Sequence, residues 1–412
     1  MGLMLVALPT QARQTLDTPD AVAVLAAPDR ERTRMNARVF DRVWSETRSQ
    51  YYDPNLHGVD WGAARRTYRP EALAATDDRT LYRVMSRMLA LLDDAHAGVI
   101  SPAAARRQDG LRQPRAALGV TLRADPEDGS YLIEKVRPGS PAAEAGLDVG
   151  WRLLIDERSE WSPDRDVVEG QTLRLNLRDA AGQSRAVTVM PRILPPLAPF
   201  VADRSREGVL LLRIEGFEAG LGQWMGGQLA NLEPATEVVI DLRGNPGGRL
   251  HEADAVLSCF LPVNRTWATR TVRSGRRVPL RTMGGCGDRQ MPADNPVAIL
   301  VDAESRSAAE LTPAALQEAG RAVVVGEQTA GAVLISQETR LPDGGRLTLS
   351  RADFVTSGGV RLEKRGVRPD ILAARSAEDS RAGRDPVLEA ALAALRTAHD
   401  AATVSTAEVL AL

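Results

Sequence analysis

Serine is the residue type in this sequence best placed to act as a nucleophile. Ser305 and Ser307 lie in the segment 304–310, between an apolar run at 297–301 and an amphipathic stretch at 307–319. A serine at a helix start has a backbone N–H beside its hydroxyl, which is the arrangement that acyl transfer needs. Ser307 and Glu310 also fit a Ser-x-x-Glu capping box, which alone would explain both residues. The local pattern favours the cap and leaves the nucleophile as the alternative.

A glycine-rich turn at Asp241–Gly248 could bind an anion. It reads Asp-Leu-Arg-Gly-Asn-Pro-Gly-Gly, after an apolar run at 238–241 and before an expected helix at 249–260. Backbone N–H groups at a helix start attract negative charge. No Gly-Lys-Ser/Thr follows, which excludes a P-loop, and the glycine spacing does not fit a dinucleotide-binding fingerprint. An oxyanion hole is the anion-binding use that remains, and a tight turn that merely needs glycine is the alternative.

Metal and cofactor chemistry is not expected. No two of the four histidines have metal-ligand spacing, and two cysteines 27 positions apart do not make a zinc site. His57 and His399 are expected to be structural or solvated, and His251 to face outward from the helix after the glycine turn. His96 follows two aspartates at the end of a helical stretch, where the helix dipole favours a cation. The cysteines, Cys259 and Cys286, could form one disulfide or remain two buried thiols.

Composition and charge exclude several classes of protein. The chain has 412 residues, of which 43% are hydrophobic and 26% charged, as in a soluble globular protein of two or three domains. Its 52 basic and 54 acidic residues give a formal charge of −2, and no clustered basic face indicates nucleic-acid binding. No apolar run reaches 18 residues, so no membrane-spanning helix is expected. The apolar start, 1–9, resembles the end of a secretory signal peptide, with a frayed terminus as the alternative.

The segments that must position these residues change character along the chain. Residues 30–92 show the apolar spacing of helices, and short β-like runs between glycine turns follow. From 208 onward strands and helices alternate, which predicts an α/β layer with a largely parallel sheet, and a hairpin then turns at 343–345. The expected parts are a leader at 1–29, a helical region at 30–105, a β domain at 115–193, an α/β core at 200–375, and a terminal helix and tail at 376–412.

Several motifs in this order resemble one family, the carboxy-terminal processing and tricorn-like serine peptidases. The resemblance extends from about Phe40 to Ile371. The motifs that carry it are Tyr51-Tyr52-Asp53-Pro54, Asp93-Asp94-Ala95-His96, the PDZ-like segment Pro138–Leu147, the turn Asp241–Gly248, Ser305–Glu310, Gly320–Thr329 and Gly366–Ile371.

The resemblance implies a fold and a set of roles. The fold would be α/β and β multi-domain: a helical N-terminal region, an inserted PDZ-like β domain and a crotonase-like α/β catalytic core. The nucleophile falls on Ser307, because Ser305 aligns with the first serine of the motif. Backbone N–H groups of Gly247, Gly248 and Ala308 would hold the oxyanion. The family chemistry implies no cofactor and no metal.

The resemblance also implies which residue acts as the base. Ser–Lys members of the family place a lysine where this chain has Ala332, and its two lysines, Lys135 and Lys364, do not align there. The tricorn-like branch uses a histidine and a glutamate, which fall on His96 and Glu363. An imidazole with an ordinary pKa near 6.5 can accept a serine proton at neutral pH. Ala95 replaces the polar residue that precedes the tricorn histidine, so that relay is incomplete.

The PDZ-like part implies a peptide-binding role. PDZ domains bind extended carboxy termini by strand addition, with the carboxylate held at a glycine-containing loop that Leu118-Gly119-Val120 resembles. Trp151 stands where aspartate is usual, and Pro163 interrupts the short segment in which the helix of the groove would lie. Two roles of this domain are left open: it orients the substrate, or it only packs beside the active site.

The interpretation is a serine endopeptidase of the cell envelope, periplasmic or otherwise exported, that hydrolyses polypeptide substrates through an acyl-enzyme. Ser307 would be the nucleophile and His96 the general base. The alternatives are a catalytically silent family member that binds peptides or other ligands, and a PDZ-based scaffold. Substrate identity, cleavage preference and oligomeric state leave no trace in the sequence.

Overall fold

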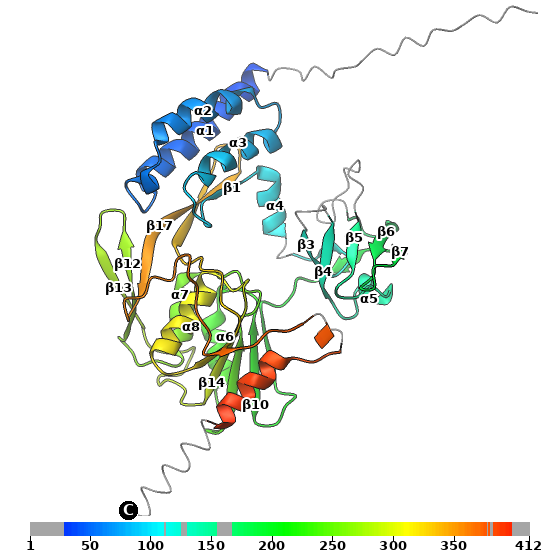
Figure 1. The fold of residues 1–412 in the computed structure, drawn as a ribbon, viewed down its shortest axis with the longest axis vertical. Coiled ribbons are helices and arrows are strands. Elements are labelled where there is room, and N and C mark those ends of the chain that lie inside the picture. Colours follow the sequence, from blue (N-terminus) through cyan, green and yellow to red (C-terminus); the bar gives the residue numbers. More distant parts are fainter. Residues whose placement is uncertain are drawn as a thin grey trace, which may run out of the picture.

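The computed structural model describes residues 29–110, 113–124, 130–154, 167–376, 378–379 and 382–397. They form a helical region, a small β domain and an α/β core (Figure 1). The expected leader before Asp29, the residue Pro163, and the tail with His399 lie outside the described residues. No described helix is long and apolar enough to span a membrane.

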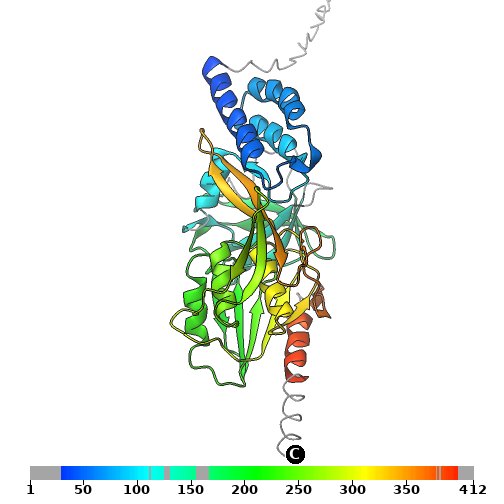
Figure 2. The ribbon, with the colours of Figure 1, turned by 90° about the vertical axis from the view of Figure 1, so that its left-hand side faces the viewer.

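The helical region contains three helices within the predicted range, α1 (Arg30–Gln50), α2 (Trp61–Ala74) and α3 (Asp78–Ala90). Each begins after an aspartate whose side chain accepts an N–H of the first turn: Asp29, Asp60 and Asp77. Their apolar faces pack together with Leu341, Leu347 and Leu349 of a core hairpin. The hairpin, drawn in orange, therefore joins the helical region to the core (Figure 2).

The small β domain lies to one side of the core. After β1 (Gly98–Ile100) and α4 (Pro102–Gly110), the chain enters this domain through β2 (Arg115–Ala117) and leaves it through β8 (Arg192–Leu194), which pair antiparallel. Inside is an antiparallel sheet in the order β3-β4-β5-β6-β7 with one short helix, α5 (Pro141–Glu144). The strands are β3 (Val120–Ala124), β4 (Tyr131–Val136), β5 (Arg152–Leu154), β6 (Leu173–Arg178) and β7 (Ser184–Val189).

The core is built on a six-stranded sheet in the order β18-β15-β14-β11-β10-β9, parallel except for β9. The strands are β9 (Phe200–Asp203), β10 (Val209–Ile214), β11 (Glu237–Asp241), β14 (Val297–Val301), β15 (Val323–Gly326) and β18 (Ile371–Leu372). Four of them are the apolar runs from which a parallel sheet was predicted, so that prediction is confirmed.

Both faces of this sheet are covered. On one face, Val238, Ile240 and Ile299 pack with the helices α6 (Leu221–Leu229), α7 (Leu250–Ser258) and α8 (Ala308–Glu318). On the other, their neighbours Val239 and Leu300 pack with the C-terminal helix at 386–397. Successive residues of a strand point to opposite faces, so these runs must be apolar throughout.

A second sheet connects the core to the helical region. Its order is β1-β17-β12-β13, with β16 also paired to β17. The predicted hairpin at 343–345 joins β16 (Ile335–Arg340) to the long β17 (Arg346–Thr356). The strands β12 (Thr266–Val272) and β13 (Arg277–Arg281) form a further hairpin that the sequence analysis did not predict. Because β1 pairs with β17, the segment just after His96 is attached to this sheet.

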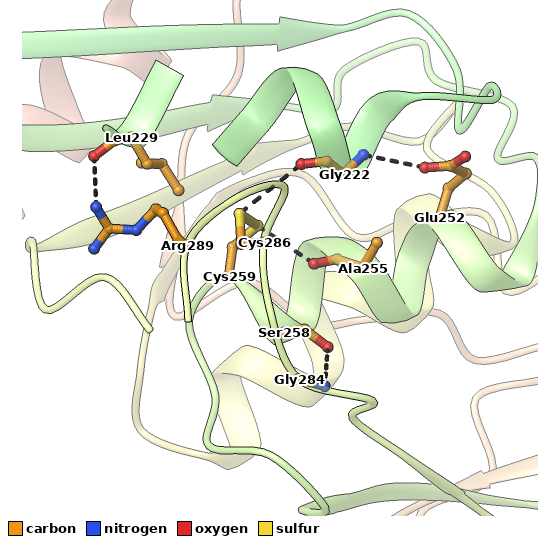
Figure 3. Close-up of a disulfide and its surroundings, with 9 residues drawn as sticks. All are labelled: Gly222, Leu229, Glu252, Ala255, Ser258, Cys259, Gly284, Cys286 and Arg289. Carbon is orange, nitrogen blue, oxygen red and sulfur yellow. Dashed lines mark hydrogen bonds between the residues drawn. A yellow bond between two sulfur atoms is a disulfide. The ribbon is translucent and has the colours of Figure 1, made fainter. Parts of the chain in front are cut away.

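Cys259 and Cys286 form a disulfide, which decides between the two states left open (Figure 3). Both cysteines are buried. Cys259 caps the C-terminal end of α7, and Cys286 lies in the loop that crosses α6. A Cβ placed on Gly226 of α6 would lie 2.1 Å from the Cys286 carbonyl oxygen, so this loop is packed directly against the helix.

Removing the disulfide is expected to destabilise the core. The Cys259→Ala/Cys286→Ala double variant should lose roughly 2–4 kcal/mol of unfolding free energy, because the cross-link restricts the unfolded chain. Urea unfolding of the oxidised protein and the variant measures this difference. The wild type under a strong reductant should match the variant, and equal stabilities of the oxidised protein and the variant would contradict the prediction.

Candidate active site

Ser307 occupies a backbone conformation that a helix cap does not need. It is the N-cap of α8, with φ 54° and ψ −118°. The aspartates that cap α1, α2 and α3 all have negative φ, as N-cap residues usually do. A positive φ at a residue other than glycine is strained, and such residues concentrate at functional sites. The expected capping box is present, since the Ser307 N–H donates to Glu310 Oε2 (3.1 Å).

Glu310 is the buried carboxylate that holds this loop. Its side chain has no exposed surface. Oε1 accepts the Thr329 hydroxyl (2.6 Å) and the Gly331 N–H (2.7 Å), and Oε2 accepts the N–H groups of Ala332 (2.9 Å) and Ser307. The Ala332 carbonyl in turn accepts the Ser307 N–H at 2.8 Å. Glu310 thereby joins the serine to the segment where Ser–Lys relatives would carry their lysine.

Ser305 is fixed in a structural position. It is fully buried, and its hydroxyl donates to the Leu242 carbonyl (2.9 Å) and accepts the Asp302 N–H (3.0 Å). Asp302 also accepts the Gly244 N–H at 2.9 Å, so these contacts hold the glycine turn against the serine loop. Of the two serines, Ser307 is therefore the one whose surroundings leave room for chemistry.

The glycine turn reaches the serine closely. A Cβ on Gly247 would lie 2.7 Å from Ser307 Cβ and 3.0 Å from the Ala308 nitrogen, and Gly247 has φ 95°. The Gly247 N–H, however, donates to Asn245 Oδ1 at 2.8 Å. The expectation that this N–H would hold an oxyanion is therefore wrong, because an uncharged side-chain acceptor already occupies it.

The N–H groups of Gly248 and Ala308 remain available among the described residues, since neither donates to any group there. Gly248 forms an isolated parallel bridge with Phe217 in which the neighbouring residues, Gly247 and Arg249, make the hydrogen bonds. In such a bridge the N–H of the central residue points away from its partner. Two N–H groups without a partner among the described residues thus follow the two residues in closest contact: Ala308 follows Ser307, and Gly248 follows Gly247.

His96 lies on the loop between α3 and β1, mostly buried, with 14% of its side chain exposed. Its Nδ1 is 4.0 Å from Asp94 Oδ1. Glu363 faces it from the core, and its Oε2 accepts the Val333 N–H at 2.9 Å. Burial raises the pKa of Glu363, while the Val333 N–H and the charge of His96 lower it.

A series of contacts relates Ser307 to His96, with no direct hydrogen bond between them in the part of the chain described. Ser307 is bonded to Ala332, the next residue Val333 is bonded to Glu363, and Glu363 interacts with His96. Lys364 binds Asp93 through its ammonium group, and its N–H donates to the Gly331 carbonyl (2.7 Å). This contact ties the histidine loop to the core. Catalytic hydrogen bonds are often long in ligand-free structures.

The loop Leu118-Gly119-Val120 lies on a cleft of about 1150 Å³ between the small β domain and the core. Core residues on its wall include Gly216 and Arg249, which flank the glycine turn in space. Lys135 crosses the cleft to Glu215, at 3.8 Å. The cleft therefore extends from the small domain to the part of the core beside the glycine turn. Among the described residues no cluster of histidine, cysteine or carboxylate side chains could hold a metal ion.

Comparisons with known proteins identify the family that the chain matches. Residues 208–373 match peptidase family S41, and residues 33–90 match the tricorn protease C1 domain. The chain carries a peptidase family S41 domain. This peptidase is accordingly a serine-type hydrolase.

Three relatives illustrate the extent of the similarity. A carboxyl-terminal-processing protease of Picosynechococcus sp. is 26% identical over 346 residues, covering 80% of this chain and 81% of its own. Putative tricorn protease homolog 2 of Streptomyces coelicolor is 27% identical over 389 residues, covering 86% of this chain and 32% of its own. The structure of the photosystem II D1 C-terminal processing protease aligns with a TM-score of 0.58 at 21% identity, covering 82% of this chain and 93% of its own.

Two polar side chains within the recognised motifs make contacts that the sequence did not predict. Asn245 Oδ1 accepts the Gly247 N–H, and its amide group donates to the Ile214 carbonyl (2.7 Å). Asp94 was recognised only as part of the motif before His96, and its Oδ1 accepts the His96 backbone N–H at 2.8 Å.

The close approach of Gly247 to Ser307 predicts a sensitive position. The Gly247→Ala variant of the peptidase should react with a fluorophosphonate at least ~100-fold more slowly, because the added methyl group displaces Ser307 and the two N–H donors. Gly244→Ala is the matched control. It has φ 70° in the same turn, but its Cβ would meet only Lys135 Nζ, at 4.0 Å. Equal losses in the two variants would contradict the prediction.

Glu363 is expected to make the stability of the peptidase depend on pH. Burial raises the pKa of Glu363 in the folded state, so ionisation of its carboxyl group lowers the unfolding free energy as the pH rises through this raised pKa. A Glu363→Gln variant keeps an oxygen for the Val333 N–H but stays neutral. It should therefore have a higher unfolding free energy than wild type at pH 8, and the difference should vanish near pH 4. Urea unfolding at both pH values checks this, with the exposed Glu233→Gln as control. A variant less stable than wild type at pH 8 would contradict the prediction.

Proposed function

We propose that this peptidase hydrolyses peptide bonds within polypeptide substrates through an acyl-enzyme on Ser307, with His96 as the general base. The observation that carries the proposal is the strained Ser307, which is packed against Gly247 of the glycine turn, together with the adjacent N–H groups of Gly248 and Ala308, neither of which has a partner in the described structure. Two N–H groups aimed beside a serine hydroxyl are the arrangement that stabilises a tetrahedral oxyanion.

In the proposed reaction the Ser307 hydroxyl loses its proton to His96 and attacks the substrate carbonyl carbon. The carbonyl oxygen becomes an oxyanion that accepts hydrogen bonds from Gly248 and Ala308. The protonated His96 then gives its proton to the departing amine, which leaves an ester on Ser307. Water, deprotonated by His96, attacks this ester and releases the acid, and the proton returns to Ser307.

Histidine is proposed as the base because no lysine occupies the appropriate position. Ala332 stands at the place of the lysine, Lys364 is bound to Asp93, and Lys135 pairs with Glu215. Glu363 is proposed to stabilise the protonated His96 from the core side, since its charge already interacts with that ring. A positive imidazolium beside this buried carboxylate would lower the free energy of the charged intermediate.

The cleft at Leu118-Gly119-Val120 is proposed to receive the polypeptide. Gly119 has φ 83°, and its Cβ would overlap Ser140 Cβ at 2.2 Å, so only glycine fits this loop. The carbonyl groups of Leu118 and Gly119 accept N–H groups of Ala142 and Arg137. A loop held in this way, in a PDZ-like sheet, suits an extended peptide that continues toward Ser307.

An exported location in a bacterial cell envelope is proposed for the peptidase. The disulfide between Cys259 and Cys286 supports it, because disulfides persist in oxidising compartments and are rare in the cytosol. The relatives are bacterial processing proteases and chloroplastic ones.

The decisive experiment is covalent labelling with a fluorophosphonate, followed by peptide mapping. The wild type should be labelled on Ser307, the Ser307→Ala variant should not be labelled, and His96→Ala should react at least ~100-fold more slowly. Ser184→Ala, at an exposed position of the small β domain, is the control and should react as wild type.

The labelling result also separates the alternatives. A folded wild type that is not labelled would favour a catalytically silent peptide-binding member or a PDZ-based scaffold over the proposed enzyme. Labelling of His96→Ala at the wild-type rate would leave the nucleophile in place and overturn the choice of base.

A further inference from the structure

Three buried polar atoms without hydrogen-bond partners gather behind His96. They are His96 Nδ1, Asp94 Oδ2 and Tyr51 Oη, each with no partner among the described residues. The side chains of Asp94 and Tyr51 have no exposed surface. An unpaired buried polar atom is costly, so three together indicate groups that bond to one another in another state of the site.

Contacts in the structure relate these atoms to each other. Asp94 Oδ1 accepts the His96 backbone N–H at 2.8 Å and lies 4.0 Å from His96 Nδ1. Burial first, and then the charge of Asp94, raises the pKa of Tyr51, which means that the carboxylate lies near the phenol. Tyr51 is held from its other sides by Tyr52 and His57, with ring centroids 4.9 and 5.6 Å away.

The neighbouring His57 is already fixed by its own partners. Its Nδ1 donates to the Leu92 carbonyl (2.7 Å), and its Nε2 accepts the Tyr52 hydroxyl (2.8 Å). Both ring nitrogens of His57 are therefore already hydrogen bonded and are not available to Asp94 or His96. Lys364 binds Asp93 and not Asp94, so the buried carboxylate of the pair is left facing the phenol and the imidazole.

We propose that Asp94 is the positioning residue of the catalytic base: its carboxylate accepts the His96 Nδ1–H, and the Tyr51 hydroxyl donates to its second oxygen. The inference rests on the proposed role of His96. A proton held on Nδ1 leaves the lone pair of Nε2 to accept the proton of Ser307. The hydrogen-bonded chain Tyr51–Asp94–His96 takes the place of the polar residue that Ala95 replaces.

The role fits the position of Asp94 in the fold. Asp94 and His96 share one loop, so their spacing is set locally, whereas Tyr51 comes from the end of α1. The proposed hydrogen bond requires the 4.0 Å separation between Asp94 Oδ1 and His96 Nδ1 to close to about 2.8 Å. Glu363 faces the same ring from the core, so the imidazolium would lie between two carboxylates, one from its own loop and one from the core.

Nitrogen-15 NMR of the histidine rings in the full chain tests the proposal directly. The chain has only four histidines, and the spectrum of His96→Ala identifies the His96 signals. At a pH where the ring is neutral, wild-type His96 should carry its proton on Nδ1. In Asp94→Asn the Nε2-protonated form should become dominant, and Asp148→Asn, at an exposed position of the small β domain, should keep the wild-type form. A wild-type ring protonated on Nε2, or a form unchanged in Asp94→Asn, would overturn the proposal.

Labelling kinetics supply the second measurement. Asp94→Asn should lower the maximal rate of fluorophosphonate labelling by about 10²- to 10⁴-fold and leave the half-saturating concentration within about threefold, as loss of an orienting carboxylate does in other serine hydrolases. Tyr51→Phe should lower the same rate about 3- to 10-fold. If Asp94→Asn does not fold, the tautomer of the wild-type His96 ring and the labelling rate of Tyr51→Phe still test the proposal. A Tyr51→Phe variant that is labelled at the wild-type rate would show that Tyr51 does not take part in the proposed hydrogen bonds.

The two proposals can fail separately. A wild type that is not labelled, but whose His96 tautomer depends on Asp94, would overturn the proposed peptidase function and retain the pairing. A wild type that is labelled, but whose His96 tautomer does not change in Asp94→Asn, would overturn the pairing and retain the proposed peptidase function.

Discussion

The active site depends on one buried negative charge, the Glu310 carboxylate. A carboxylate inside a protein is tolerated only when its oxygens are fully hydrogen bonded. Glu310 satisfies this with four donors taken from two segments, the serine loop and 329–332. The same bonds hold Ser307 at a φ of 54°, a conformation that the loop alone would not adopt. The carboxylate thus stabilises the fold and the strained residue together.

A second constraint attaches the histidine loop to the core. The β16–β17 hairpin belongs to the core by chain order, yet its leucines complete the apolar core of the helical region. Its strand β17 also pairs with β1, which immediately follows the histidine loop. Lys364 and Asp93 add a contact across the same boundary. The helical region is therefore packed onto the catalytic core by apolar burial, by pairing of strands and by ion pairs that include Lys364–Asp93 and Arg351–Glu46, and the His96 loop is placed as a consequence.

Much of the architecture was predictable, since the decisive signals are local. Apolar runs such as 238–241 and 297–301 predict buried parallel strands, and the serine loop and glycine turn were recognised by their order. The strands β12 and β13 were not predicted, because Arg270, Arg277 and Arg281 interrupt their apolar pattern. The pairing of Cys259 with Cys286, the loss of the Gly247 N–H to Asn245, and the meeting of Tyr51 with Asp94 depend on distances between segments far apart in the chain. Such contacts carry energy without leaving a periodic pattern.

The C-terminal helix has a consequence for how the protein is made. Val387, Ala391 and Leu395 pack on the face of the central sheet that includes Val239 and Leu300. A nascent chain emerging from the ribosome acquires the serine, the turn and every strand of this sheet before the residues that shield it. Until the last helix docks, that apolar surface is open to water and to other chains. The central sheet thus keeps one apolar face uncovered until the helix at 386–397 has been made, and a chaperone has a well-defined surface to protect in the meantime.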